Sequence, residues 1–323
     1  MFKIKQLPED FFVREIPNKD FKKKGTFAVF LLKKTNYTTE KAIQTICTSL
    51  IVQRKHVGYA GIKDRNAITE QYISILNAKS KNLELNDIKL QFQGYLSEPI
   101  SLGDLKGNYF EIVIRNLEKE QTINSINYVP NYFDEQRFSK NNVQIGRYIL
   151  KRDFKNAVLE MLKSNGDYEK KVAAYLKDHD KDYVGALRRV PKKILLLFVH
   201  AYQSYLFNIT IKKYLKECLK TKQKENQDIP LIGFGMEIPN QKIEKIITDL
   251  MNEENITTRD FIIREIPELS SEGGFRKLFA EIQDLTIGTK EKDELNKGKY
   301  KLKVAFSLSK GSYATIVIKE LFK

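Results

Sequence analysis

The order of secondary-structure patterns constrains this chain most, because strand-like segments stand at both ends and a helical stretch lies between them. Runs rich in β-branched and aromatic residues predict strands at 11–16, 26–32, 70–76, 87–96, 108–115 and 300–308. From about residue 141 apolar residues recur at spacings of three and four, which predicts helices, the longest over 191–220. We therefore expect one β-containing domain interrupted by a helical insertion.

Local signals refine this outline. Thr38-Thr39-Glu40 predicts a helix start, since a hydroxyl cap precedes apolar residues at helical spacing: Ala42, Ile43, Ile46 and Leu50. Four aromatic residues of the long helix are expected to lie in the core: Phe198, Tyr202, Tyr205 and Phe207. The charged run 290–294 predicts a solvated face or linker, and 312–322 predicts a short amphipathic element.

The chain is strongly basic. It carries 56 Lys and Arg against 41 Asp and Glu, a net charge of +15, which suggests a polyanionic partner such as RNA. A lysine-rich genome would produce the same composition without any ligand. The segment 221–285 is acidic within this basic chain, so we expect phosphate-binding surface elsewhere.

Several functional classes lack their sequence signals. The two cysteines, Cys47 and Cys218, are far apart, and His56, His179 and His200 do not cluster with them, so we expect no metal site. The longest apolar run, 194–199, is too short to span a membrane, and the N-terminus lacks a signal-peptide core. A cytoplasmic protein without a membrane segment is predicted.

The segment from Gly58 to Gln71 has the most specific chemistry. It reads as a glycine-bearing loop between two strands, and it places Asp64 between the cations Lys63 and Arg65. Such neighbours favour an ionised carboxylate, which can act as a nucleophile or a base. An ordinary turn aspartate, paired to its neighbours, is the alternative that local chemistry leaves open.

This segment resembles the signature of the TruD pseudouridine synthases, A-G-x-K-D-x-x-A-x-T-x-Q. Every fixed position matches: Ala60, Gly61, Lys63, Asp64, Ala67, Thr69 and Gln71. Further family elements resemble Lys5 with 8–11, 105–110, 129–138, 203–208 and 311–315. The family usually has glycine where this chain has Asp134 and Ser139, and 221–270 match no element of the pattern.

The resemblance implies an enzyme that isomerises uridine to pseudouridine in RNA, typically uridine 13 of tRNA, without a cofactor. It implies an α+β fold, in which a catalytic domain with a central, mostly antiparallel sheet is interrupted by an α+β insertion domain. The catalytic domain would comprise residues 1–127 and 282–323, and the insertion 128–281. We expect a monomer whose partner is tRNA.

The resemblance also implies roles for single residues. Asp64 would be the essential carboxylate and Lys5 its basic partner, although a solvated N-terminal lysine is the plain alternative. Phe110 would stack on the target uracil, unless it points into the core of the sheet. Asn108, Lys63 and Gln71 are expected to shape the pocket.

Three residues are expected to contact RNA: Arg65, Asn131 and Arg137. A second hypothesis is a non-catalytic RNA-binding protein or chaperone that retains the fold, which the basic charge supports equally well. The two hypotheses differ at Asp64, since a protein without the activity has no need of that carboxylate. An unrelated nuclease is disfavoured because the sequence has no cluster of acidic metal ligands.

Overall fold

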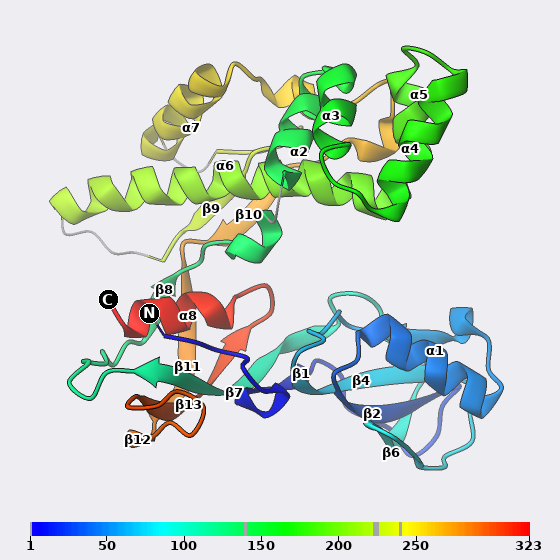
Figure 1. Cartoon of the computed structure of the whole chain (residues 1–323), viewed down its shortest axis with the longest axis vertical. Coiled ribbons are helices and arrows are strands. Elements are labelled where there is room, and N and C mark those ends of the chain that lie inside the picture. The colour runs from blue at the N-terminus through cyan, green and yellow to red at the C-terminus, as the bar shows by residue number, and fades with distance from the viewer. Residues whose placement is uncertain (1, 139–140, 222–225, 239–240) are drawn as a thin grey trace. The chain divides into compact units, whose positions relative to one another are not determined.

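The structure, a computed structural model, describes residues 2–138, 141–221, 226–238 and 241–323. The chain forms two compact units (Figure 1). One comprises Met1–Val129 with Glu281–Lys323, and the other Pro130–Ala280. The sequence analysis placed the divisions after residue 127 and before residue 282.

The first unit is built on a twisted sheet with the order β5-β6-β2-β4-β1-β7-β13-β11-β8, to which β3 and β12 add at β4 and β13. β1 and β4 run parallel, whereas β2, β6, β7 and β13 pair antiparallel with their neighbours. The expected α+β fold with a mostly antiparallel sheet is therefore confirmed. Its strands are β1 Phe11–Pro17, β2 Phe27–Thr35, β3 Val57–Tyr59, β4 Ile68–Leu76, β5 Leu83–Leu85, β6 Ile88–Leu96, β7 Leu105–Leu117, β8 Tyr128–Pro130, β11 Phe279–Ile287, β12 Glu291–Lys292 and β13 Tyr300–Ser309.

Helix α1 (Thr39–Leu50) begins where the sequence predicts. The Thr38 side chain accepts a hydrogen bond from the Lys41 N–H, which satisfies one of the free amides of the first turn. The apolar positions Ala42, Ile43 and Ile46 are fully buried and belong to the same core cluster as strands β2, β4 and β6. This packing fixes the first turn of α1 beside β4. Helix α8 (Ala314–Leu321) follows β13, as the amphipathic pattern predicts.

The second unit is mainly helical (Figure 1). The long helix α6 lies at its centre in the core cluster with the other helices, and Phe198, Tyr202 and Phe207 are buried in that core as expected. A two-stranded sheet completes the unit. Its elements are α2 Asn142–Leu150, α3 Phe154–Met161, α4 Asp167–Asp178, α5 Tyr183–Leu187, α6 Lys192–Thr221, α7 Gln241–Glu254, β9 Asp228–Leu231 and β10 Gly274–Lys277.

Helix α6 has the length that the sequence predicts, but it is more apolar than the sequence analysis expected. Residues Lys192–Cys218 are long and apolar enough to cross a membrane by length and composition alone. However, 61% of the most apolar window of this helix is buried inside the protein. The apolar character is thus accounted for by core packing, because a helix surrounded by other helices needs apolar side chains on most of its faces.

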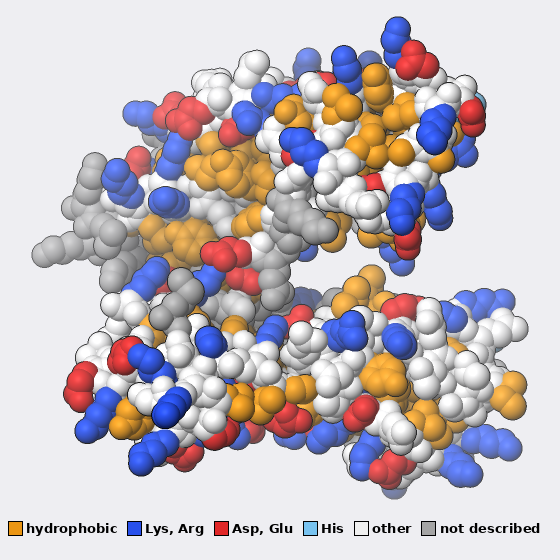
Figure 2. All heavy atoms as spheres, in the orientation of Figure 1, with side chains coloured by type: hydrophobic (Ala, Val, Ile, Leu, Met, Phe, Trp, Pro, Cys, Tyr) orange, Lys and Arg blue, Asp and Glu red, His pale blue; other side chains and the backbone are white. Residues whose placement is uncertain are grey.

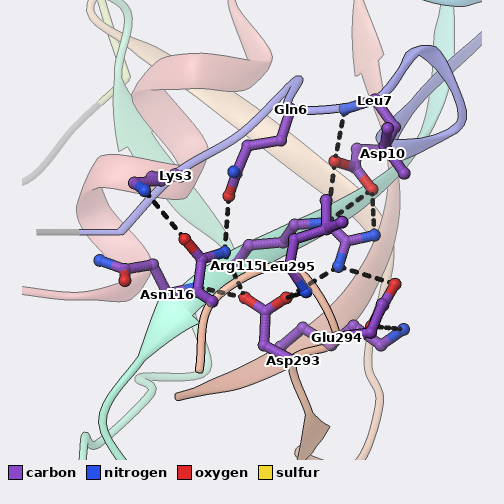
Figure 3. A network of polar contacts seen from close by, with 11 residues as sticks. Lys3, Gln6, Leu7, Asp10, Arg115, Asn116, Asp293, Glu294 and Leu295 are labelled. Carbon is purple, nitrogen blue, oxygen red and sulfur yellow. Dashed lines mark hydrogen bonds and ion pairs between the residues drawn. The ribbon is translucent and has the colours of Figure 1, made fainter. Parts of the chain in front are cut away.

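The charged run 290–294 is largely exposed, as its composition predicts, except at Asp293. The Asp293 side chain is buried, and it accepts hydrogen bonds from the Arg115 guanidinium at 3.0 Å and the Asn116 N–H at 2.9 Å (Figure 3). Asp10 and Glu294 bind the same guanidinium. The composition predicted exposure because it could not show a buried arginine 178 residues away in the chain.

The visible charge is mixed. On the face shown in Figure 2, Lys and Arg side chains are interspersed with Asp and Glu over both units. The Lys and Arg side chains on this face are therefore not gathered at one place.

Candidate active site

Asp64 lies in the loop between β3 and β4. Lys63 and Asp64 differ in exposure: Lys63 is buried, whereas the Asp64 side chain keeps 45% of its surface exposed. Ile62 and Arg65 are also exposed. The loop therefore presents one carboxylate to solvent while its neighbour anchors it to the protein.

Side chains of α1 and β4 hold this loop by hydrogen bonds. The Thr39 hydroxyl accepts a hydrogen bond from the Lys63 N–H at 2.9 Å and donates one to Gln71 Oε1 at 3.0 Å. Gln71 Nε2 in turn donates to the Gly61 carbonyl at 3.0 Å. Gln71 is fully buried, so it shapes the loop and does not face a substrate.

A buried lysine holds the backbone of Asp64. Lys34 is fully buried, and its ammonium donates to the carbonyls of Tyr37, at 2.6 Å, and of Asp64, at 2.8 Å. Burial lowers the pKa of Lys34 to about 8, against the opposing effect of Asp64. Because both bonds end on main-chain oxygens, they fix where the loop can place the carboxylate.

The cation that pairs with Asp64 comes from the N-terminal segment. Lys5 Nζ lies 2.6 Å from Asp64 Oδ2, and the same ammonium sits over the Phe11 ring at 4.1 Å from its centroid. The Lys5 side chain is only 16% exposed. A compact charge that is held on both sides in this way restricts the orientation of the Asp64 carboxylate.

Lys63 does not pair with Asp64, although the two are adjacent. Its ammonium donates to Asn108 Oδ1 at 2.5 Å and lies 3.0 Å from Glu15 Oε2. Glu15 is buried, and burial raises its pKa even though Lys63 opposes that shift. Lys63, Asn108 and Glu15 thus form an internal polar contact between the loop and strands β1 and β7.

Phe110 is buried between two other aromatic residues. Its ring packs 6.3 Å from Phe11 and 5.6 Å from Phe306, and only 7% of the residue is exposed. This placement favours the core alternative over a face open for stacking on uracil. Phe110 supports Phe11, on which the Lys5 ammonium rests.

Gly58 and Gly61 have different roles. A Cβ at Gly58 would meet the Ile100 carbonyl oxygen at 2.3 Å, whereas a Cβ at Gly61 would meet no atom within 4 Å. We expect Gly58→Ala to lower the free energy of unfolding by about 1–3 kcal/mol, because backbone lines the contact and cannot move aside. Gly61→Ala is the matched control, with an expected change of less than about 0.5 kcal/mol in urea unfolding. Equal losses in both variants would contradict the close-approach argument.

Two residues expected to bind RNA lie in the second unit. Asn131 is buried: its Nδ2 donates to the Lys277 carbonyl at 3.1 Å, and its Oδ1 accepts from Arg276 at 2.6 Å. This favours a structural role. Arg137 is half-buried, donates to Ser204 Oγ at 3.3 Å and lies over the Phe133 ring.

Comparison with known proteins decides the family. A family model described as tRNA pseudouridine synthase D (TruD) matches residues 2–167, 158–229 and 226–321. The chain belongs to the TruD family. The expectation of an enzyme, a pseudouridine synthase that acts as an isomerase, is confirmed by this membership.

Relatives in the TruD family match over nearly their whole length. The tRNA pseudouridine synthase D of Aquifex aeolicus is 32% identical, covering 99% of this chain and 98% of the relative. The "Probable tRNA pseudouridine synthase D 2" of Methanocaldococcus jannaschii is 33% identical, covering 99% of this chain and 91% of the relative. A crystal structure of a Methanosarcina mazei protein assigned as TruD superposes with a TM-score of 0.74 at 26% identity, covering 99% and 93%.

The chain departs from the TruD pattern at Asp134 and Ser139, where the family usually has glycine. Asp134 is buried and does not take a positive φ, so the absence of the usual glycine imposes no left-handed strain there. Ser139 lies outside the described residues. Within the described ranges, no group of three or more His, Cys, Asp or Glu side chains is placed to hold a metal ion.

Two residues that hold the Asp64 loop were missed in the sequence analysis. Lys34 follows Phe30 and Leu32 at alternating positions of β2, so the strand period places a lysine on the buried face. That signal was available. Thr39 was read only as part of a helix start, and its bonds to Lys63 and Gln71 depend on tertiary contacts that no local pattern contains.

Proposed function

We propose that this enzyme converts uridine 13 of tRNA to pseudouridine, with Asp64 as the essential carboxylate and without a cofactor. The observation that supports the proposal most is the ion pair between Lys5 Nζ and Asp64 Oδ2, at 2.6 Å, on a loop of the TruD signature. The two residues are 59 positions apart in the sequence. The loop that carries Asp64 is fixed by the hydrogen bond from the Lys63 N–H to the Thr39 hydroxyl. An exposed carboxylate whose orientation is fixed by an ion pair and by hydrogen bonds to its loop is typical of a reactive group.

The reaction needs little beyond an oriented carboxylate. The bond between uracil N1 and the ribose C1′ breaks, the base turns over, and C5 bonds to the same carbon. The proton at C5 is lost and N1 gains one, so no electrons are exchanged overall. The target uridine must leave its stack to reach Asp64, which is 45% exposed at the tip of the loop. Lys5 holds the carboxylate in a fixed orientation.

The other site residues act around this pair. Lys63, Asn108 and Gln71 are buried or half-buried and bonded to protein groups, and we assign them to shaping the loop. Arg65 is exposed one position after Asp64, where a guanidinium suits a phosphate of the bound tRNA. Arg137 is a second candidate for a phosphate contact.

We further propose that residues 1–127 and 282–323 form the catalytic domain and 128–281 the insertion domain. The division into Met1–Val129 with Glu281–Lys323, and Pro130–Ala280, supports this assignment. Every residue of the Lys5–Asp64 site belongs to the first unit. We also propose a cytoplasmic monomer, as the sequence analysis expects.

Tritium release tests the proposed reaction. A tRNA transcript carrying uridine tritiated at C5 is incubated with the enzyme, and a transcript with cytidine at position 13 is the matched control. Release from the first transcript alone supports position 13, because forming the new carbon–carbon bond displaces the C5 hydrogen. Equal release from both transcripts means that another uridine reacts. No release from either contradicts the proposed substrate.

Lys5→Met is expected to lower kcat by about a hundredfold, since it removes one charge that orients the reactive group while keeping the apolar stem. The variant should retain its affinity for tRNA, because Lys5 is mostly covered. Lys19→Met is the matched control: Lys19 pairs with Asp104 at 2.7 Å in the same unit. If kcat of Lys5→Met equals that of Lys19→Met, Lys5 has no role in catalysis.

A further inference from the structure

Lys5 has an uncommon backbone conformation. Its φ is 59°, in the left-handed region, which a lysine adopts only when surrounding contacts impose it. The conformation occurs at the residue whose ammonium pairs with Asp64.

Arg115 holds both flanks of this segment. Its backbone N–H and carbonyl exchange two hydrogen bonds with Lys3, at 2.8 and 2.9 Å. Its guanidinium binds Asp10 at 2.9 Å, and Asp10 Oδ2 accepts from the Leu7 N–H at 2.9 Å. Lys5 thus lies between two anchors that both end on one buried arginine of β7.

The Asn296 side chain also binds the segment that contains Lys5. Its Oδ1 accepts from Lys3 Nζ, and its Nδ2 donates to Gln6 Oε1, both at 2.8 Å. The same Nδ2 donates to Asp293 Oδ2 at 2.7 Å, which joins it to the Arg115 network. Figure 3 shows Lys3 and Gln6 pointing toward the loop that carries Asp293 and Leu295.

The geometry points to Asn296 as a positioning residue that holds Lys5 on Asp64. This inference rests on the proposed function, in which the Lys5–Asp64 pair is the reactive centre. Asn296 grips the side chains of Lys3 and Gln6, which bracket Lys5 in sequence. Its contacts with Lys3 and Gln6 lie at the surface, where a lost hydrogen bond changes overall stability little. Asp293 keeps its hydrogen bonds from Arg115 and the Asn116 N–H when the Asn296 amide is removed. The main consequence of losing Asn296 is therefore a change in the path of residues 3–6.

A double-mutant cycle tests the inference. Asn296→Ala is expected to lower kcat about tenfold with KM for tRNA and the melting temperature nearly unchanged, because misplacing a catalytic partner slows the reaction without weakening binding. In the Lys5→Met background the same change should cause no further loss, since there is no ammonium left to position. Lys301→Met is the control: Lys301 pairs with Glu294 at 2.6 Å on the side of the network away from the N-terminal segment.

The outcomes separate this inference from the proposed function. Wild-type rates in Asn296→Ala, with Lys5→Met impaired, overturn the positioning role alone. An equal fold loss in both backgrounds shows a purely structural effect and also overturns it. Hydrogen exchange of the Lys3 and Leu7 amides gives a readout independent of turnover. We expect faster exchange in Asn296→Ala than in Lys301→Met, and equal exchange in the two variants refutes the inference even for a preparation without activity.

Discussion

Replacing Asp64 with asparagine is expected to abolish tritium release from labelled tRNA while leaving tRNA affinity almost unchanged. Asparagine keeps the shape of the side chain and can still accept a hydrogen bond from Lys5, which lies 2.6 Å from the carboxylate. It removes the charge that nucleophilic or basic chemistry needs. The loss in kcat should be at least about a thousandfold, the range seen when a reacting group is removed.

Binding should survive this change because affinity for RNA comes mainly from cations on phosphates. Removing one exposed negative charge does not weaken those contacts. Glu40→Gln is the matched control: Glu40 is 49% exposed, close to the 45% of Asp64, and pairs with Arg54 at 2.8 Å. The control should keep the wild-type rate. Turnover by Asp64→Asn within tenfold of that rate would rule out the proposed role.

Arg115→Met is expected to cause the largest loss of stability, about 3–5 kcal/mol, because it leaves buried carboxylates without their partner. Asp10 and Asp293 are both buried, and both bind the guanidinium at 2.8–3.0 Å (Figure 3). Hydrogen bonds to Asp10 raise the pKa of Arg115 above its ordinary, already high value, so the guanidinium remains charged at every working pH. Urea unfolding followed by circular dichroism measures the loss.

Arg54→Met is the control for this comparison, since Arg54 makes a similar ion pair with Glu40 at the surface. Exposed pairs contribute about 1 kcal/mol or less, so the control should lose no more than that. Similar losses in the two variants would mean that burial of the Arg115 network does not determine its contribution.

The same network predicts a sensitivity to acid. Burial alone would raise the pKa of Asp293, but hydrogen bonds from the Asn116 N–H, Asn296, the Leu295 N–H and Arg115 lower it from 3.8 to about 2. Since the folded pKa lies below the unfolded one, the stabilisation is present above about pH 4 and is lost as the pH falls toward 2. Without the guanidinium, acid unfolding should begin at a higher pH.

The sequence by itself determined the fold class, the place of the long helix and the loop that carries Asp64. Each of these depends on local information. The strand and helix periods follow from which side chains must be buried, and the cap at Thr38 is a contact within one turn. The signature from Ala60 to Gln71 identified the family because its residues are contiguous.

Only the tertiary structure decided which charged side chains form ion pairs with one another. The adjacent residues Lys63 and Asp64 have different partners: Lys63 binds Asn108 and Glu15, and Asp64 pairs with Lys5 from 59 residues away. The sequence could not show that Asp293 is buried, because its partner Arg115 lies in another strand. Pairing between charges depends on distance in space, and a sequence pattern reports only distance along the chain.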